Sequence, residues 1–190
     1  VPQTRHRVII VGIRNDLPVE FHVPDPKMYA SCDITARKAL AEIPDNAPNN
    51  EVRKLTQKVI RRLSLINAGE NVWQAEERLG ELFPEELKIK TKTKISQIYR
   101  KLDPDKPAYT VTAAGGGTFM YHRTDRELTN RERARIQTFP DNYEFVGNYS
   151  SVRKQIGMAV PCQLSEVVIT AVLNSFAGID YPWIPANMEE

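Results

Sequence analysis

"RELTNRERARIQTFPDNYEF", residues 126–145, is the stretch that decides the fold of this chain. Thr129 and Glu132 have the spacing of a capping box, in which two side chains satisfy backbone N–H groups at a helix start. The pattern therefore predicts a helix that begins at Thr129 and ends before "PDNYEF". The capping box explains both residues without any substrate. We expect Arg135 and Gln137 to have packing or surface roles.

Two further helices have clear signals. The apolar stretch from Pro161 to Phe176 predicts a last helix that ends at Gly178, because glycine favours the left-handed conformation of a helix end. Its Val, Ile, Leu and Ala content indicates that it is mostly buried. Earlier in the chain, apolar residues at helical spacing predict a helix over residues 52–66, and Thr35 is a candidate cap for a short helix over residues 35–43.

Strand signals come from three segments. "VIIVGI" (Val8–Ile13) is a continuous apolar run that predicts a buried strand. "KIKTKTKI" (Lys88–Ile95) alternates with period two, which predicts a strand with four lysines on one face. A DNA backbone or simple exposure at a sheet edge would relieve their repulsion. Residues 107–122 form a third strand-like stretch, interrupted by Gly115–Gly117.

Composition is that of an ordinary soluble domain. The chain has 190 residues, of which 41% are hydrophobic and 26% charged, so one or two domains with a real core are expected. No apolar run approaches the length of a membrane helix, and no partner membrane is expected. A net charge of +2 does not diagnose nucleic-acid binding. The only two cysteines, Cys32 and Cys162, suit a reducing cytosol, and no metal site is expected from the ligand spacing.

Three stretches, in this order, resemble the DNA (cytosine-5)-methyltransferase family. "VPQTRHRVIIVGIRND" (1–16) is similar to the family's Gln-x-Arg-x-Arg motif and the strand after it. Residues 126–145 resemble the motif before the family's final helix, and Arg131 and Glu132 match its pattern. "KQIGMAVPCQLSEVV" (154–168) resembles the closing Gly-Asn-Ala-Val-Pro motif. "YRKLDPDKPAYTVTA" (99–113) also resembles the end of the family's target-recognition region.

The resemblance implies a known reaction for the whole enzyme. A cytosine is flipped out of the duplex. A cysteine thiolate attacks C6, a glutamic acid pairs with N3, and C5 takes a methyl group from S-adenosylmethionine. In the family these groups, and a Phe-x-Gly-x-Gly cofactor turn, precede the Gln-x-Arg-x-Arg motif. Here Pro161-Cys162-Gln163 and "ENV" (Glu70–Val72) follow it, so we expect both tripeptides to be coincidences. No cofactor turn is present in this sequence.

Supporting groups are expected in this chain. Gln3, Arg5 and Arg7 alternate, so their side chains share one face if the backbone is extended. The resemblance implies catalytic support, with Arg7 toward the flipped base and Arg5 toward a structural or phosphate partner. The alternative is that both arginines are only strand-edge charges.

Cofactor and DNA contacts are also implied. The segment Gly157, Met158, Ala159 and Val160 would lie near the bound S-adenosylmethionine, although Met158 replaces an Asn and cannot donate its amide hydrogen bonds. The expected DNA contacts are Lys88, Lys90, Lys92, Lys94, Arg100, Lys101, Thr110 and Thr112.

The expected fold is a mixture of α/β and α+β. Residues 1–16 and 119–190 would form the edge of a doubly wound methyltransferase sheet, and residues 17–118 an irregular α+β target-recognition domain. This predicts the carboxyl-terminal portion of a bacterial, cytoplasmic, nucleoid-associated DNA cytosine-5-methyltransferase of a restriction–modification system. Its partners would be double-stranded DNA and an amino-terminal half that binds most of the cofactor.

Two alternatives remain open for the function. One is a non-catalytic, sequence-specific DNA-binding module. The other is a permuted enzyme that uses Cys162 and Glu70. By itself the half-enzyme would be inactive, and the apolar surface of its last helix would be exposed, which predicts that the isolated chain is sticky or dimeric.

Overall fold

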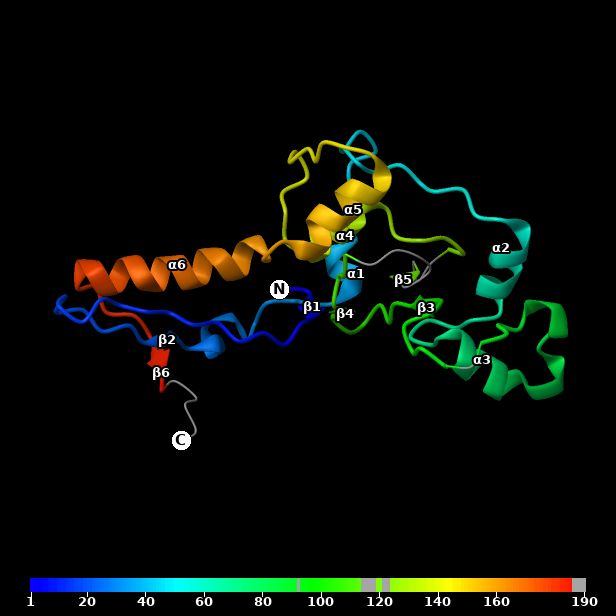
Figure 1. The fold of residues 1–190 in the computed structure, drawn as a ribbon, viewed down its shortest axis with the longest axis horizontal. Helices are drawn as coiled ribbons and strands as arrows, with labels where there is room; N and C mark the ends of the chain where they lie inside the picture. Colours follow the sequence, from blue (N-terminus) through cyan, green and yellow to red (C-terminus); the bar gives the residue numbers. More distant parts are fainter. Residues whose placement is uncertain (92, 114–118, 121–123, 186–190) are drawn as a thin grey trace.

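The computed structural model describes residues 1–91, 93–113, 119–120 and 124–185 (Figure 1). A small helical unit lies at the centre, a second helical unit lies on one side of it, and one long helix extends to the other side with an arm of chain beneath it. The centre therefore joins the two outer parts.

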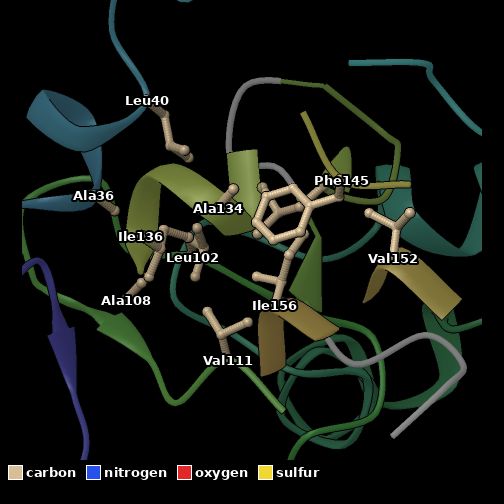
Figure 2. Close-up of a cluster of buried hydrophobic side chains, with 11 residues drawn as sticks. Ala36, Leu40, Leu102, Ala108, Val111, Ala134, Ile136, Phe145, Val152 and Ile156 are labelled. Carbon is tan, nitrogen blue, oxygen red and sulfur yellow. The ribbon is translucent and has the colours of Figure 1, made fainter. Parts of the chain in front are cut away.

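The central unit packs helices α1 (Ala36–Ala39), α4 (Asn130–Ile136) and α5 (Tyr149–Met158) around one apolar core. Figure 2 shows the apolar side chains of this core meeting between the helices. The core consists of Ala36, Leu40, Leu102, Ala108, Val111, Leu128, Ala134, Ile136, Phe145, Val152 and Ile156.

The predicted capping box is confirmed at the start of α4. The Thr129 hydroxyl accepts from the Glu132 N–H at 3.0 Å, and the Glu132 carboxylate accepts from the Thr129 N–H at 2.7 Å. The helix ends at Ile136, before a residue in the left-handed region, Thr138 with φ 59°. The cap on the short helix is also confirmed, because Thr35 accepts from the Lys38 N–H.

The second unit has its own core. Helices α2 (Gln57–Ser64) and α3 (Val72–Leu79) and the 3-10 turns η2 (Gly80–Leu82) and η3 (Glu85–Leu87) surround it. Its members are Leu63, Ile66, Val72, Ala75, Phe83 and Leu87. The helix expected over residues 52–66 is shorter than predicted, because its cap is Thr56 and the preceding residues are not helical.

The described residues form three two-residue strand pairs. Two are parallel and one is antiparallel. The pairs are β1 (Gln3–Thr4) with β4 (Ala108–Tyr109), β3 (Arg100–Lys101) with β5 (Phe119–Met120), and β2 (Val23–Pro24) with β6 (Trp183–Ile184). Helix and strand are mixed, as expected. The doubly wound sheet remains an expectation, since these short pairs do not form one.

Two predicted strands are wrong. Val8–Ile13 is not paired with any described residue, and the side chains of Val8 and Ile10 are 88% and 89% exposed. The described residues of Lys88–Ile95 also form no strand; Thr91 and Thr93 instead bond each other in a local turn. A strand requires a neighbour for its backbone groups, and the sequence pattern does not supply one. Lys92 and Gly115–Gly117 lie outside the described residues.

Helix α6 (Cys162–Ala177) ends at Gly178, which is in the left-handed conformation with φ 66°, as predicted. The arm of chain that carries β2 lies along α6, and the Tyr181 hydroxyl fixes it by donating to the His22 carbonyl at 2.8 Å. The expectation that α6 is mostly buried is wrong. Of its residues only Ala171 is buried, because the arm covers one face alone.

One helical run, Tyr149–Ala177, is long and apolar enough to cross a membrane by length and composition, contrary to the sequence-based expectation. It consists of two helices, because the backbone is extended at Ala159 and Pro161. The 16 residues of α6 span about 24 Å at 1.5 Å per residue, which is less than the ~30 Å of a bilayer core.

Gly157 is the closest contact between α5 and the chain after β4. A Cβ atom at this position would lie 2.3 Å from the backbone of Thr112 and Ala113. We therefore predict that Gly157→Ala lowers the free energy of unfolding by about 2 kcal/mol or more, because backbone atoms must move. Urea denaturation measures this. The control is Gly12→Ala, where no atom lies within 4 Å of the added carbon. Equal stability of both variants would contradict the prediction.

Candidate functional site

A buried pair of amides joins the first residues of the chain to α4 and to the segment between α5 and α6. Gln3 Nε2 donates to Gln137 Oε1 at 2.7 Å and to the Ile136 carbonyl at 3.1 Å. Gln137 Nε2 donates to the carbonyls of Ile156 at 2.7 Å and Ala159 at 3.2 Å. Gln137 is 0% exposed. The packing role expected for Gln137 is thus a polar junction between distant segments.

Arg5 and Arg7 have different environments. Arg5 donates to the carbonyls of Val111 at 3.0 Å and Gly157 at 3.3 Å, and burial, assisted by the charge of Arg7, lowers its pKa. Arg7 is exposed, and among the residues that the structure describes its side chain donates only to the neighbouring His6 carbonyl, at 2.6 Å. Gln3 is buried. The three side chains therefore do not share one face toward solvent. Gln3 and Arg5 donate to backbone carbonyls, and Arg7 is exposed to solvent.

The closing segment Gly157–Val160 comprises the last two residues of α5 and the two residues after it. Its backbone is already occupied: the Gly157 carbonyl accepts from Arg5, and the Ala159 carbonyl accepts from Gln137. Met158 and Val160 are 67% and 60% exposed. The segment therefore presents apolar side chains outward, and its polar groups face inward.

Cys162 lies at the first position of α6, where its N–H donates to the Gln137 carbonyl at 3.1 Å. Burial raises the pKa of its thiol. Since the thiolate is the nucleophile, this environment opposes catalysis.

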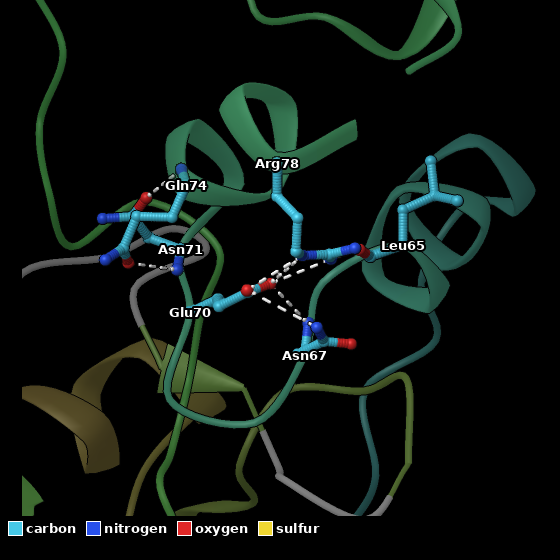
Figure 3. Close-up of polar contacts among 6 residues, drawn as sticks. All are labelled: Leu65, Asn67, Glu70, Asn71, Gln74 and Arg78. Atoms are coloured by element: carbon cyan, nitrogen blue, oxygen red, sulfur yellow. Dashed lines mark hydrogen bonds and ion pairs between the residues drawn. The ribbon is translucent and has the colours of Figure 1, made fainter. Parts of the chain in front are cut away.

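The Glu70 carboxylate is held by neighbouring residues of the second unit. Figure 3 shows its carboxylate between Arg78 and Asn67, with the shortest contact 2.9 Å to Arg78 Nε. The hydrogen bond from Arg78 lowers the pKa of Glu70. Glu70 precedes α3, whereas Cys162 begins α6 at the other side of the central unit (Figure 1). The structure does not bring these two residues together.

Lys101 is not available as a DNA contact in this structure. Its ammonium donates to Asp125 at 2.8 Å, and its side chain is 9% exposed. Lys88 is also paired, with Glu85 at 2.7 Å, which raises the pKa of Lys88, but it stays nearer the surface. Lys90 and Lys94 are exposed.

Three predicted DNA contacts, Lys88, Lys94 and Arg100, lie at one open hollow beside α3. Arg100 also stacks on Tyr109, with the guanidinium carbon 4.1 Å from the ring centroid. Thr110 lies elsewhere and donates to the Thr4 carbonyl at 2.7 Å. Thr112 packs its backbone on Gly157. The structure thus groups part of the predicted set and separates the two threonines from it.

The buried arginines of α4 have roles that sequence reasoning missed. Arg131 is 0% exposed and donates to the carbonyls of Pro48, Pro140 and Tyr143. Burial lowers its pKa. Because it satisfies three carbonyls of two loops, it fixes those loops to the helix. Dense charge on a short helix was the available signal, but such charge is usually solvated.

Comparison with known proteins gives the class of this chain. Type II methyltransferase M.BbvI of Brevibacillus brevis is 52% identical over 100% of this chain and 50% of that protein. M.NgoFVII of Neisseria gonorrhoeae is 43% identical, over 95% of the chain and 49% of that protein. M.AquIB of Picosynechococcus sp. is 45% identical over 45% of the chain and 69% of that protein.

The family follows from a second finding. The family model for C-5 cytosine-specific DNA methylases matches residues 1–174, so the chain belongs to that family. The expected resemblance is confirmed at this level. The chain spans about half the length of the first two relatives.

We predict that Gln137→Leu destabilises the chain by about 2–4 kcal/mol, because Gln3 and the carbonyls of Ile156 and Ala159 each lose a hydrogen bond. Thermal unfolding followed by circular dichroism measures the loss. Gln155→Leu is the matched control, since the Gln155 amide is exposed and donates to the Val146 carbonyl. If Gln137→Leu were as stable as this control, the junction would have no structural weight.

The lowered pKa of Glu70 predicts a pH-dependent contribution to stability. Because the folded pKa is below the unfolded one, the contribution is present above the unfolded pKa and disappears as pH falls through the folded pKa. Glu70→Gln should cost up to about 1 kcal/mol at neutral pH, and this cost should shrink toward zero in acid. Urea unfolding at neutral and at acidic pH measures this cost, with Glu81→Gln, a substitution at an exposed residue, as the control. A cost that is independent of pH would refute the ion-pair explanation.

Proposed function

We propose that this chain is the carboxyl-terminal portion of a DNA cytosine-5-methyltransferase. It would bind the target site in double-stranded DNA and complete, with an amino-terminal half, the site that methylates cytosine C5 from S-adenosylmethionine. Family membership over residues 1–174 and the coverage of about half of two relatives support this proposal. The order of the three motifs supports the carboxyl-terminal position.

The observation that carries the proposal is an uncovered apolar stripe on α6. Ile169, Leu173 and Phe176 are 57%, 62% and 52% exposed. At 100° per residue they share one side of the helix, opposite buried Ala171, which faces the arm. Such a stripe on a soluble protein marks an interface. The amino-terminal half is the proposed occupant, because the relatives contain about as much chain again.

Arg7 is the proposed contact to the flipped base. Its guanidinium is exposed and can donate further hydrogen bonds to a base carbonyl or a phosphate. Arg5 and Gln3 are proposed to position it, because both fix the backbone of the same short segment. The nucleophile and the catalytic glutamic acid are proposed to lie in the amino-terminal half.

S-adenosylmethionine fits the closing segment only as an apolar contact. Met158 and Val160 point outward, and the carbonyls beside them are already bonded. When bound, the cofactor would supply the methyl group. These two side chains would help exclude water from it, and the polar contacts would come from the other half.

DNA binding is proposed for the target-recognition domain, residues 17–118, with residues 1–16 and 119–190 in the catalytic part. Within these bounds the independently packed region is the unit of α2 and α3. Lys88, Lys90, Lys94 and Arg100 remain proposed contacts, and most of them would meet phosphates. Since the relatives include bacterial type II methyltransferases, we propose a bacterial, cytoplasmic, nucleoid-associated enzyme of restriction–modification without a membrane partner.

We predict that the chain by itself transfers no methyl group from labelled S-adenosylmethionine to unmethylated genomic DNA. Transfer should appear when the matching amino-terminal half is co-expressed. Arg7→Ala should then lower kcat at least tenfold, because an interaction with the reacting base is lost. Arg14→Ala, at an exposed arginine paired with Asp16, is the control.

The same assay separates the alternatives. DNA binding without methyl transfer, even with the partner half, would favour a non-catalytic DNA-binding module. Methyl transfer by the chain alone that is lost in Cys162→Ser would show a permuted enzyme, contrary to the proposal.

The uncovered stripe predicts self-association of the isolated chain. Light scattering should show a dimer or larger species at high concentration, because apolar surface is removed from water in contacts between copies. Leu173→Glu should shift the population toward monomer. A monodisperse wild-type monomer under these conditions would contradict the proposed role of the stripe.

A further inference from the structure

The hollow beside α3 has a rigid wall. Val72 and Ala75 anchor the helix in the second core and are 0% exposed. Trp73 Nε1 donates to the Ile95 carbonyl at 3.1 Å, which ties the same helix to the opposite side of the hollow. The backbone of α3, from which several side chains extend into the hollow, is therefore fixed.

Gln74 and Arg100 are two of the residues with donor groups that line the hollow; Lys94 and Lys88 also line it, and Lys88 is paired with Glu85. The Gln74 carbonyl oxygen is already used, because it accepts from the Asn71 N–H at 3.0 Å in the capping box shown in Figure 3. The Gln74 amide therefore offers its NH₂ group as a donor. Arg100 has only donors, and its buried Nε has no hydrogen-bond partner within the described residues. Its guanidinium plane is held against Tyr109.

Acceptors lie in the same hollow. Glu76 and Glu77 both line it, and neither forms an ion pair within the described residues. Because two carboxylates lie among the cations Lys88, Lys94 and Arg100, the lining is mixed in charge and does not suit a phosphate alone. Donors and acceptors side by side suit the edge of a base pair instead.

The major-groove edge of a G·C pair matches this arrangement. Guanine presents the acceptors N7 and O6, and cytosine presents the N4 amino donor. An arginine guanidinium donates to the N7 and O6 acceptors of guanine, and a glutamate carboxylate accepts from the N4 amino group of cytosine.

We propose that this hollow reads a G·C pair of the target site, with Gln74 and Arg100 donating to guanine and Glu76 or Glu77 accepting from cytosine. The proposal rests on the proposed function insofar as it takes duplex DNA as the ligand. It adds a specificity site and two base-reading groups, Gln74 and the Glu76–Glu77 pair, that the sequence did not indicate. Lys94, whose ammonium lies 5.7 Å from the centre of the Trp73 ring, would contact the flanking phosphate.

The test is selection of a random duplex library on this chain, followed by sequencing of the bound DNA. The wild-type motif should contain a G·C pair at one position that depends on Gln74. The decisive variant is Gln74→Glu, because Glu also serves as the capping-box acceptor, so the helix start is kept while the donor is lost. Preference for guanine at that position should fall about tenfold or more.

Two controls make the result specific. Lys106→Ala removes an exposed lysine that pairs with Asp103 at 3.2 Å outside the hollow, and it should leave the motif unchanged. Replacing the selected guanine by 7-deazaguanine removes N7, which should weaken wild-type binding; it should weaken Gln74→Glu binding less, because that variant has already lost one of the two donors to guanine. Circular dichroism of Gln74→Glu confirms that the helix is intact.

Uniform binding of all duplexes by the wild type, or an unchanged guanine preference in Gln74→Glu, would overturn the proposal. Selection measures binding alone. A failure of methyl transfer with the amino-terminal half would therefore refute the proposed enzyme and leave this result standing.

Discussion

The buried amide pair of Gln3 and Gln137 is the constraint on which the central unit depends. An amide removed from water must have partners, and here they come from the start of the chain, the end of α4 and the end of α5. The Gln137 carbonyl also accepts from the Cys162 N–H, which fixes the start of α6. Gln3 Oε1 accepts from the Val111 N–H at 3.3 Å. The beginning of the chain, α4, α5 and α6 are thus aligned by hydrogen bonds that have directions, whereas apolar contacts alone would allow sliding.

Several polar side chains of this structure are buried, and several large apolar side chains are exposed. Arg131 donates to three carbonyls inside the central unit, while Val8 and Leu173 are exposed. Buried charged groups and exposed large apolar side chains depart from the usual distribution, although the two apolar cores themselves are buried. These departures fit the proposed interface with an amino-terminal half, and the chain covers about 50% of M.BbvI.

The positive charges also divide by environment. Lys101 is held by Asp125 inside the molecule, and Lys90 is free at the surface. Arg100 lies between these extremes, stacked on an aromatic ring at the hollow beside α3. A sum of charges therefore says little about DNA contacts. Phosphate binding needs exposed cations, and base reading needs donors and acceptors that are fixed before the DNA arrives.

The sequence by itself determined the features that local hydrogen bonds specify: the capping box at Thr129 and the end of α6 at Gly178. Family membership also followed from it, because the motifs keep their order. Only the tertiary structure decided which polar groups are buried and which apolar runs are covered. Val8–Ile13 has the composition of a strand, but a strand forms only beside another strand. Gln137 lies in the stretch 126–145, but that stretch does not reveal its partners, because its role arises from carbonyls that folding brings to it. Such long-range contacts depend on the whole chain, so a local pattern cannot contain them.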